Sequence, residues 1–224
     1  MVYVTGDIHG DIDRLFDRQW RKLKPSDTVI VCGDFGFLWN GDRAEKDVIK
    51  YLGSRKYTVA FLDGTHDNYD SINRCRQTVW KGGLVHRISD NLIHLCRGQI
   101  YTVEGKSIFT FGGGESTDKD MRLDSGKWWR QEIATPEEMA EGAKRLDENG
   151  KTVDFILTHE PPAPVKSAMQ LRRGETELIT KINGYFDQIS RLCKFRHWYF
   201  GSLHEDRTIT PKHTCVFKKL IPLE

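Results

Sequence analysis

An aspartate and a histidine two residues apart, Asp7 and His9, stand in the glycine-flanked stretch GDIHG at residues 6–10. The apolar residues 2–4 before them predict a short buried strand. The pair would then emerge at the strand's carboxyl end, where open α/β sheets place their ligands. A carboxylate oxygen and an imidazole nitrogen that converge on one point suit a borderline divalent ion such as Mn²⁺, Fe²⁺ or Zn²⁺. Because a surface turn explains this pair about as well, the metal interpretation depends on the rest of the chain.

The same pattern of a buried strand followed by an acidic or histidine-bearing loop recurs four more times. The runs and the side chains that follow them are 27–32 with Asp34, 57–62 with Thr65 and His66, 153–157 with His159, and 198–200 with His204. Placement at a strand end in every case is not expected of solvated loops. Because these strand ends are expected to share one sheet edge, the sequence predicts a metal site there.

The elements that must position these loops read as alternating helices and strands in the first part of the chain. Helical spacing of apolar residues predicts helices over 11–24 and 42–53. Between about 80 and 111 the pattern changes to short segments separated by turns, which predict a largely antiparallel sheet. Its expected strands are 84–88, 92–95, 100–103 and 107–111.

The second half of the chain continues with helices, strands and one basic loop. Thr135 as N-cap, followed by Pro136 and two glutamates, predicts a helix that runs to about 149. After the strand at 153–157 the sequence predicts a polar loop that contains Lys166, Arg172 and Arg173. A helix near 176–192 and closing strands near 206–210 and 213–219 complete the prediction.

The composition bounds the class of protein. A length of 224 residues, 38% of them hydrophobic, suits one α/β domain with a real core. The formal net charge of only +2 does not favour a general nucleic-acid or membrane binder. The sequence shows no basic region followed by an apolar run at its start and no apolar run long enough to span a membrane. Its five cysteines contain no CxxC pair, so we expect a cytoplasmic protein with reduced thiols. The cysteines and the strand histidines His86, His94, His197 and His213 are expected to be structural.

Five motifs taken together resemble those of the calcineurin-like metallophosphoesterases. They are GDIHG at 6–10, GDFG at 33–36, GTHD at 64–67, TH at 158–159 and GSLH at 201–204, in the order that the family has them. Each motif alone is unspecific, but the set is highly specific and spans nearly the whole chain. The resemblance implies a two-sheet α/β/β/α sandwich, with 1–224 as a single domain and a two-metal site at the strand ends.

The resemblance also implies a role for each matching residue. The implied ligands are Asp7, His9 and His204 for the first metal, Asp34 as the bridge, and His159 for the second metal. His66 would contact the substrate phosphate and protonate the leaving oxygen, so Asp34 and His66 are the predicted catalytic residues. Two ions roughly 3.5–4 Å apart clamp a phosphoryl group and make a bound water nucleophilic. We expect one or two divalent ions, with Mn²⁺ favoured and iron, zinc or nickel as alternatives.

Two residues depart from the family's pattern, and both fall on the second metal. The family usually has Asn at the position of Thr65 and His at the position of Ser202. A hydroxyl is a poorer ligand than an imidazole or an amide carbonyl for these ions. Three explanations stay open: a subfamily that accepts hydroxyl or water ligands, one tight and one weak metal, or an inactivated enzyme. The expected function is metal-dependent hydrolysis of a phosphomonoester or phosphodiester, and the alternative is a catalytically impaired metal- or phosphate-binding regulatory protein.

The polar segment at about 112–134 resembles an insertion in some small bacterial and phage members of the family. We expect it to lie on the substrate side, with Lys119 and Arg122 as contacts to the substrate phosphate. The pair Trp128 and Trp129 fits either a stacking lid or an anchor for a long loop. The expected partner is a phosphorylated small molecule, a nucleotide or a nucleic-acid end, and no membrane is expected. The sequence sets neither the substrate nor the oligomeric state.

Overall fold

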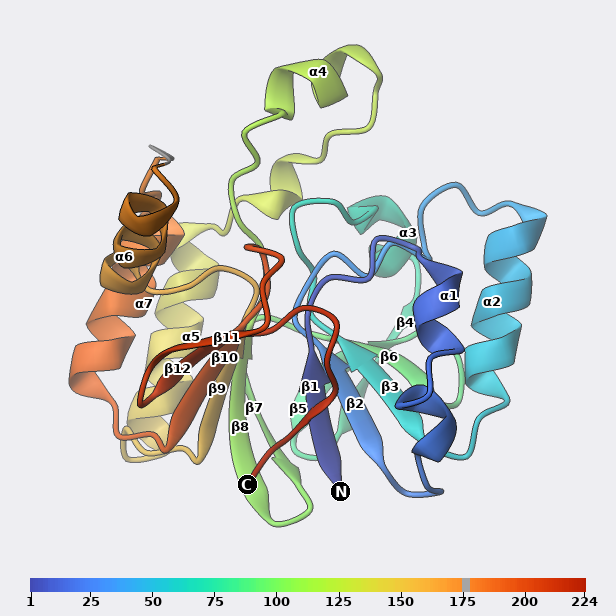
Figure 1. Ribbon diagram of the computed structural model, residues 1–224, viewed down its shortest axis with the longest axis horizontal. Helices are drawn as coiled ribbons and strands as arrows, with labels where there is room; N and C mark the ends of the chain where they lie inside the picture. The colour runs from blue at the N-terminus through green and yellow to red at the C-terminus, as the bar shows by residue number, and fades with distance from the viewer. Residues whose placement is uncertain (175–177) are drawn as a thin grey trace.

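Two β-sheets packed face to face, with helices on both outer sides, make up the computed structural model, which describes residues 1–174 and 178–224 (Figure 1). The predicted α/β/β/α sandwich is therefore confirmed. The first sheet has the order β13-β1-β2-β3-β6-β5-β4. Its strands are β1 (Val2–Thr5), β2 (Thr28–Val31), β3 (Thr58–Phe61), β4 (Arg76–Trp80), β5 (Gly83–Arg87), β6 (Leu92–Leu95) and β13 (Ile221–Pro222).

The second sheet has the order β11-β12-β10-β9-β8-β7. Its strands are β7 (Gln99–Val103), β8 (Lys106–Phe111), β9 (Phe155–Thr158), β10 (His197–Phe200), β11 (Arg207–Thr210) and β12 (His213–Cys215). The strands in the middle of each sheet run parallel, and antiparallel strands close the edges. The loops that leave the parallel strands gather at one end of the sandwich, which is the top of Figure 1.

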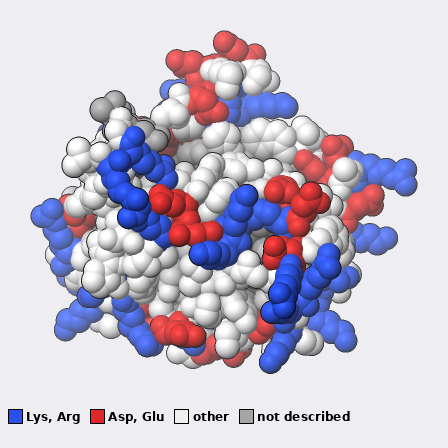
Figure 2. Space-filling model, in the orientation of Figure 1, with Lys and Arg blue, Asp and Glu red and all other residues white. Residues whose placement is uncertain are grey.

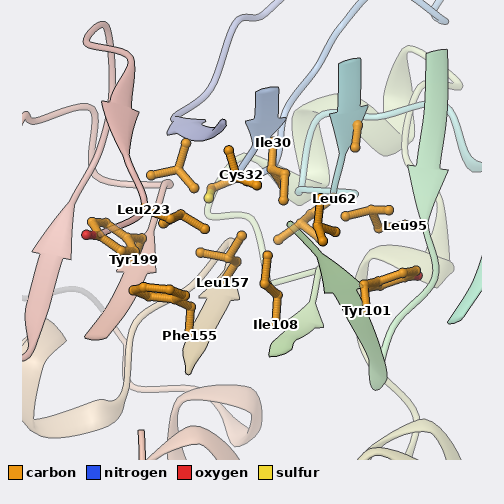
Figure 3. Packing of buried hydrophobic residues seen from close by; sticks show 14 of the residues in the cluster. Ile30, Cys32, Leu62, Leu95, Tyr101, Ile108, Phe155, Leu157, Tyr199 and Leu223 are labelled. Carbon is orange, nitrogen blue, oxygen red and sulfur yellow. The ribbon is translucent and has the colours of Figure 1, made fainter. Parts of the chain in front are cut away.

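Apolar side chains from both sheets fill the space between them. Ile30 and Leu62 of the first sheet meet Ile108, Phe155 and Leu157 of the second, all at most 1% exposed (Figure 3). Burying each such side chain stabilises the fold by about 1.5–3 kcal/mol. This shared core fixes the position of one sheet against the other, and with it the relative position of the loops at the strand ends.

Helices cover the outer face of each sheet. On the first sheet these are α1 (Ile12–Leu15), α2 (Arg43–Gly53), α3 (Tyr69–Asn73) and a 3₁₀ turn at Trp20–Lys22; on the second, α5 (Pro136–Glu148), α6 (Ala163–Arg173) and α7 (Lys181–Leu192). The predicted start of α5 is confirmed, because Thr135 and Glu138 form a reciprocal capping box. Such a cap stabilises a helix by about 1 kcal/mol.

One helix prediction and one loop prediction were wrong, the first in part. The helix expected over 11–24 breaks after α1, because the Asp17 carboxylate accepts the N–H of Gln19 at 2.7 Å, a local bond that competes with helix formation. The loop expected around Lys166 is α6, which buries Val165 and ends at Gly174 in the left-handed region. The basic residues Lys166, Arg172 and Arg173 led to the loop prediction, although the segment carries the apolar face of a helix. The predicted start of the next helix at 176 lies outside the described residues, and α7 begins at Lys181.

The largely antiparallel sheet expected between about 80 and 111 is confirmed in its antiparallel pairings but was wrong as one sheet. The four predicted strands exist, but β5 and β6 lie in the first sheet whereas β7 and β8 lie in the second. Each hairpin joins its sheet through one parallel pairing, β6 to β3 and β8 to β9. Local alternation predicts a hairpin but carries no information on which sheet the hairpin extends. The sequence prediction also missed β4 and β13, and the predicted strand at 213–219 ends at Cys215.

Charges of both signs are interspersed on the face that Figure 2 shows, as the small net charge leads one to expect. None of the helices that the structure describes has the length and apolar character needed to cross a membrane.

His213 gives the fold a predicted dependence on pH. Its ring packs against Trp198 and Phe195, and burial lowers the pKa of His213 to about 4, with a smaller contribution from His197. The folded state therefore takes up this proton at lower pH than the unfolded chain does. The contribution of neutral His213 to the free energy of unfolding is complete above the unfolded pKa of 6.5 and is lost as pH falls towards 4. We expect urea unfolding to show a loss of about 3 kcal/mol over this range, at about 1.4 kcal/mol for each pKa unit.

The variant His213→Gln has no such proton to take up. Its free energy of unfolding should therefore change less between pH 6.5 and 4 than that of the wild type. The difference in slope against pH should correspond to the uptake of about one proton on unfolding. An unchanged slope in the variant would assign the acid sensitivity to other groups.

Candidate metal centre

The loops at the carboxyl ends of five parallel strands bring together the side chains that the sequence singled out. Four residues in these loops adopt the left-handed region that non-glycine residues rarely visit, with φ of 52° at His9, 44° at Asp34, 52° at Ser202 and 49° at His204. Such backbone strain concentrates at functional sites, where the surrounding structure holds it in place. The conformation turns each loop sharply at the strand end and directs the side chains toward one another.

The first group of donor atoms comes from Asp7, His9 and His204, which lie within 4.8 Å of one another. His204 Nε2 lies 3.0 Å from His9 Nε2 and 3.0 Å from Asp7 Oδ2. Asp7 is 1% exposed, and its Oδ2 makes no hydrogen bond of good geometry with any described residue. A buried carboxylate oxygen facing two imidazole nitrogens is a donor set that suits a borderline divalent ion.

The second group consists of Asp7, Asp34 and His159, all buried. His159 lies 3.6 Å from Asp7 Oδ1 and 3.9 Å from Asp34 Oδ1, whereas the other oxygen of Asp34 lies 3.7 Å from His9 Nε2. The two oxygens of Asp34 thus face different groups, which fits a bridging ligand. Burial alone would raise the pKa of Asp34, but the nearby His159 and His66 outweigh it and lower that pKa.

Glycines leave the space that these ligands occupy. A methyl group at Gly33, whose φ is +103°, would lie 2.0 Å from His159 Nδ1, and one at Gly64 would lie 2.0 Å from Asp34 Oδ1. The same His159 nitrogen lies 3.1 Å from the carbonyl oxygen of Cys32, which orients the ring. The glycines in the motifs therefore allow the ligands to approach the backbone, besides permitting tight turns.

The two residues that depart from the family's pattern line the same site but do not belong to either group of donors. The Thr65 hydroxyl lies 2.9 Å from His66 Nδ1. Ser202 Oγ is buried and has no hydrogen-bond partner among the described residues, and its backbone N–H donates to Asp7 Oδ1 at 3.3 Å. A cavity of about 410 Å³ is lined by both residues and by four of the candidate ligands, namely His9, Asp34, His159 and His204.

His66 lies between a candidate ligand and the insertion. Its backbone N–H donates to Asp34 Oδ1 at 2.7 Å, and its Nδ1 lies 3.3 Å from Asp34 Oδ2. On the other side of the ring, Nε2 lies 2.9 Å from Asp118 Oδ2. These two carboxylates, Asp34 first, raise the pKa of His66 to about 9 and so favour the protonated ring. Sequence reasoning missed Asp118, although it stands directly before Lys119 in the segment that carries the resemblance.

The insertion carries α4 (Lys119–Asp124) and a 3₁₀ turn at Arg130–Glu132, and it projects above the strand ends (Figure 1). Arg122 is buried and contacts the Glu132 carboxylate, the Ser116 hydroxyl at 2.7 Å and the Thr65 carbonyl at 2.5 Å. It therefore clamps the insertion to the loop of His66. A direct contact of Arg122 with phosphate stays a prediction, and its protein partners do not favour it.

Lys119 and the tryptophan pair lie further out on the insertion. Lys119 Nζ sits 4.7 Å from the centre of the Trp128 ring. Trp129 donates its indole N–H to Asp70 at 3.0 Å and packs edge-on against Trp39 at 5.3 Å. Trp129 is thus an anchor, as one of the two interpretations of the sequence expected. A phosphate contact of Lys119 stays a prediction.

Comparisons with known proteins identify the family of the chain. The family model described as calcineurin-like phosphoesterase matches residues 1–191. No curated protein matches at a significant level. Among solved structures, a phosphopantetheinyl hydrolase from Mycobacterium tuberculosis is similar at 13% identity and a TM-score of 0.48, over 96% of this chain and 87% of that one. A protein of unknown function from Aquifex aeolicus is similar at 14% identity and a TM-score of 0.38, over 71% of this chain and 78% of that one. Since the family model covers most of the sequence, including four of its five motifs, the chain belongs to the calcineurin-like phosphoesterases.

Proposed function

We propose that the protein is a metal-dependent phosphoesterase that hydrolyses a phosphomonoester or phosphodiester by direct attack of water. The observation that carries the proposal is the meeting of Asp7, Asp34, His9, His159 and His204 from four separate loops, with donor atoms 3.0–4.0 Å apart. The first group would hold one divalent ion and the second group the other, with Asp34 as a ligand of both. Manganese is our favoured ion, with iron, zinc or nickel as alternatives.

Divalent ions at this centre would neutralise charge on the phosphoryl oxygens and lower the pKa of an attacking water. The residues of the chain supply the rest of the reaction. Water oxygen forms the new bond to phosphorus while the bond to the leaving oxygen breaks. Protonated His66 is placed to give its proton to that oxygen, and Asp118 holds the ring in position through the 2.9 Å contact.

The shape of the surroundings supports an organic leaving group with a flat apolar part. A cavity of about 470 Å³ begins at His9 and His66 and continues between Phe37, Trp39 and Val48. Aromatic walls next to a phosphate site suit a nucleobase or another planar group. We therefore propose a phosphorylated small molecule or nucleotide as the substrate.

Metal removal tests the proposal. The protein is stripped with a chelator and assayed on an aryl phosphomonoester and an aryl phosphodiester, with and without added Mn²⁺. We expect no turnover in the stripped protein and recovery with Mn²⁺. Turnover that is indifferent to both treatments would contradict metal dependence. Phosphate binding without turnover on either ester would favour the impaired regulatory protein, which the departures at Thr65 and Ser202 keep as the second candidate.

Those departures predict one tight and one weak ion. After dialysis we expect the wild type to retain fewer than two Mn²⁺ ions at this centre. The double variant Thr65→Asn/Ser202→His restores the amide and imidazole and should bind the second ion at least about tenfold more tightly, a gain of about 1.4 kcal/mol. Calorimetric titration with Mn²⁺ measures both steps. Two tightly held ions in the wild type would refute the weak site and favour hydroxyl ligands natural to a subfamily.

A further inference from the structure

Two histidines and one cysteine form a separate group on the outer face of the first sheet. The antiparallel register of β5 and β6 sets His86 opposite His94, and Cys96 follows two residues after His94. Their neighbours Val85 and Leu95 point into the core between the sheets, so by strand alternation these three side chains share the other face. Each of the three side chains offers one ligand atom, and these three atoms all lie within 4.8 Å of one another.

The distances within this group match those of a zinc site. His86 Nδ1 lies 3.1 Å from His94 Nδ1 and 3.7 Å from Cys96 Sγ. With Zn–N bonds of about 2.05 Å and Zn–S bonds of about 2.3 Å, tetrahedral geometry separates two nitrogens by about 3.3 Å and a nitrogen from a sulfur by about 3.6 Å. A single ion can therefore reach these atoms with only small shifts of the side chains.

The surrounding residues fix which nitrogen of His94 is available. His94 Nε2 lies 2.9 Å from Asp63 Oδ1, and a carboxylate can only accept here, so this nitrogen carries the hydrogen and Nδ1 presents its lone pair. The other oxygen of Asp63 accepts hydrogen bonds from Arg97 at 2.6 Å and from the Tyr69 hydroxyl at 3.0 Å. Metal-binding histidines are typically oriented by such a carboxylate.

Space for a further ligand lies next to the group. All three side chains line a cavity of about 430 Å³, whose rim carries Glu137 and Glu141. Three protein donors and an open fourth position describe many zinc sites that exchange a water or a small ligand. Acidic groups at the rim also favour the approach of a cation.

We propose that His86, His94 and Cys96 bind one Zn²⁺ ion, at a site distinct from the phosphoesterase centre. Binding forms one Zn–S bond and two Zn–N bonds and displaces the thiol proton to solvent. The thiolate makes the site selective for zinc over harder ions such as Mn²⁺, which the carboxylate-rich centre suits better. The competing explanation is an ordinary hydrogen bond in which His86 donates to His94.

Cobalt spectroscopy separates the two explanations, because the donors of the phosphoesterase centre include no sulfur. Intact chelator-treated protein is titrated with Co²⁺. We expect a sulfur-to-cobalt charge-transfer band together with the strong visible bands of a tetrahedral ion, both removed by an equivalent of Zn²⁺. The charge-transfer band should vanish in Cys96→Ser and persist in Cys75→Ser, a matched control at a half-buried cysteine of α3's C-terminal turn. His86→Asn should weaken Zn²⁺ binding at least about tenfold.

The absence of a charge-transfer band in the wild type at saturating Co²⁺, or its survival in Cys96→Ser, would overturn the proposal. A measurement on the wild type alone covers the case in which a variant fails to fold. Alkylation of Cys96 by iodoacetamide, followed by mass spectrometry, should slow at least about tenfold when Zn²⁺ is added, while Cys75 is unaffected. Equal rates with and without Zn²⁺ would also overturn the proposal.

Discussion

Replacing Asp34 by asparagine is expected to lower kcat/KM for any phosphoester substrate by about 10³-fold or more, equivalent to at least about 4 kcal/mol of transition-state stabilisation. Asp34 contributes an oxygen to each side of the centre, 3.7 Å from His9 and 3.9 Å from His159, and it also accepts the backbone N–H of His66. An amide keeps the shape but removes the negative charge. Both ions should therefore bind more weakly, and His66 should be held less firmly in position. Steady-state kinetics with excess Mn²⁺ measure the loss.

A matched variant controls for the loss of one negative charge. Asp124→Asn makes the same chemical change at an exposed position at the end of α4, and its activity should equal that of the wild type. Thermal unfolding of Asp34→Asn should remain cooperative, because the substitution is isosteric. If Asp34→Asn retained more than about a tenth of the wild-type activity, Asp34 would not be a catalytic ligand, and the proposed arrangement of the centre would have to change.

The strand ends of the site were predictable because each obeys a local rule. A β-branched apolar run such as Val29–Val31 predicts a buried strand, and a glycine with an acid after it predicts a turn that presents the acid. The order of the motifs then supplied the pairing of distant loops. Physical reasoning on one loop at a time could not have done so, because the 3.6 Å approach of His159 to Asp7 depends on the packing of one sheet on the other.

The features that escaped prediction depend on contacts that the folded structure makes and that no local sequence pattern signals. Asp118 of the insertion contacts His66 in the fold, where Arg122 holds that segment against the loop of His66. The sequence alone does not show this contact. The histidines of β5 and β6 look structural one at a time, and only the register of the two strands sets His86 against His94. Lys166 looked like a solvated charge, but it is buried in α6 and pairs with Glu160 at 3.0 Å.

Replacing His66 by glutamine is expected to have an effect that depends on the leaving group. If protonated His66 donates to the leaving oxygen, its loss should slow hydrolysis of an alkyl ester by about 10²–10⁴-fold, the usual contribution of general acid catalysis. A nitrophenolate leaves without help from an acid, so the same variant should lose much less on a nitrophenyl ester. Measuring kcat of the variant and the wild type on both esters shows how far the loss depends on the leaving group. Equal losses on both would indicate that His66 binds phosphate without transferring a proton.

The pH profile tests the same role through Asp118. If His66 is the acid, with its pKa raised to about 9, activity on the alkyl ester should be constant at neutral pH and fall as pH rises through that value. Asp118→Asn removes one of the two carboxylates that stabilise the charged ring, so the alkaline limb should move to lower pH, while the nitrophenyl ester shows little change. Asp120→Asn on the same helix controls for the charge of the insertion. An unmoved limb in Asp118→Asn would mean that Asp118 holds the insertion in place without tuning the acid.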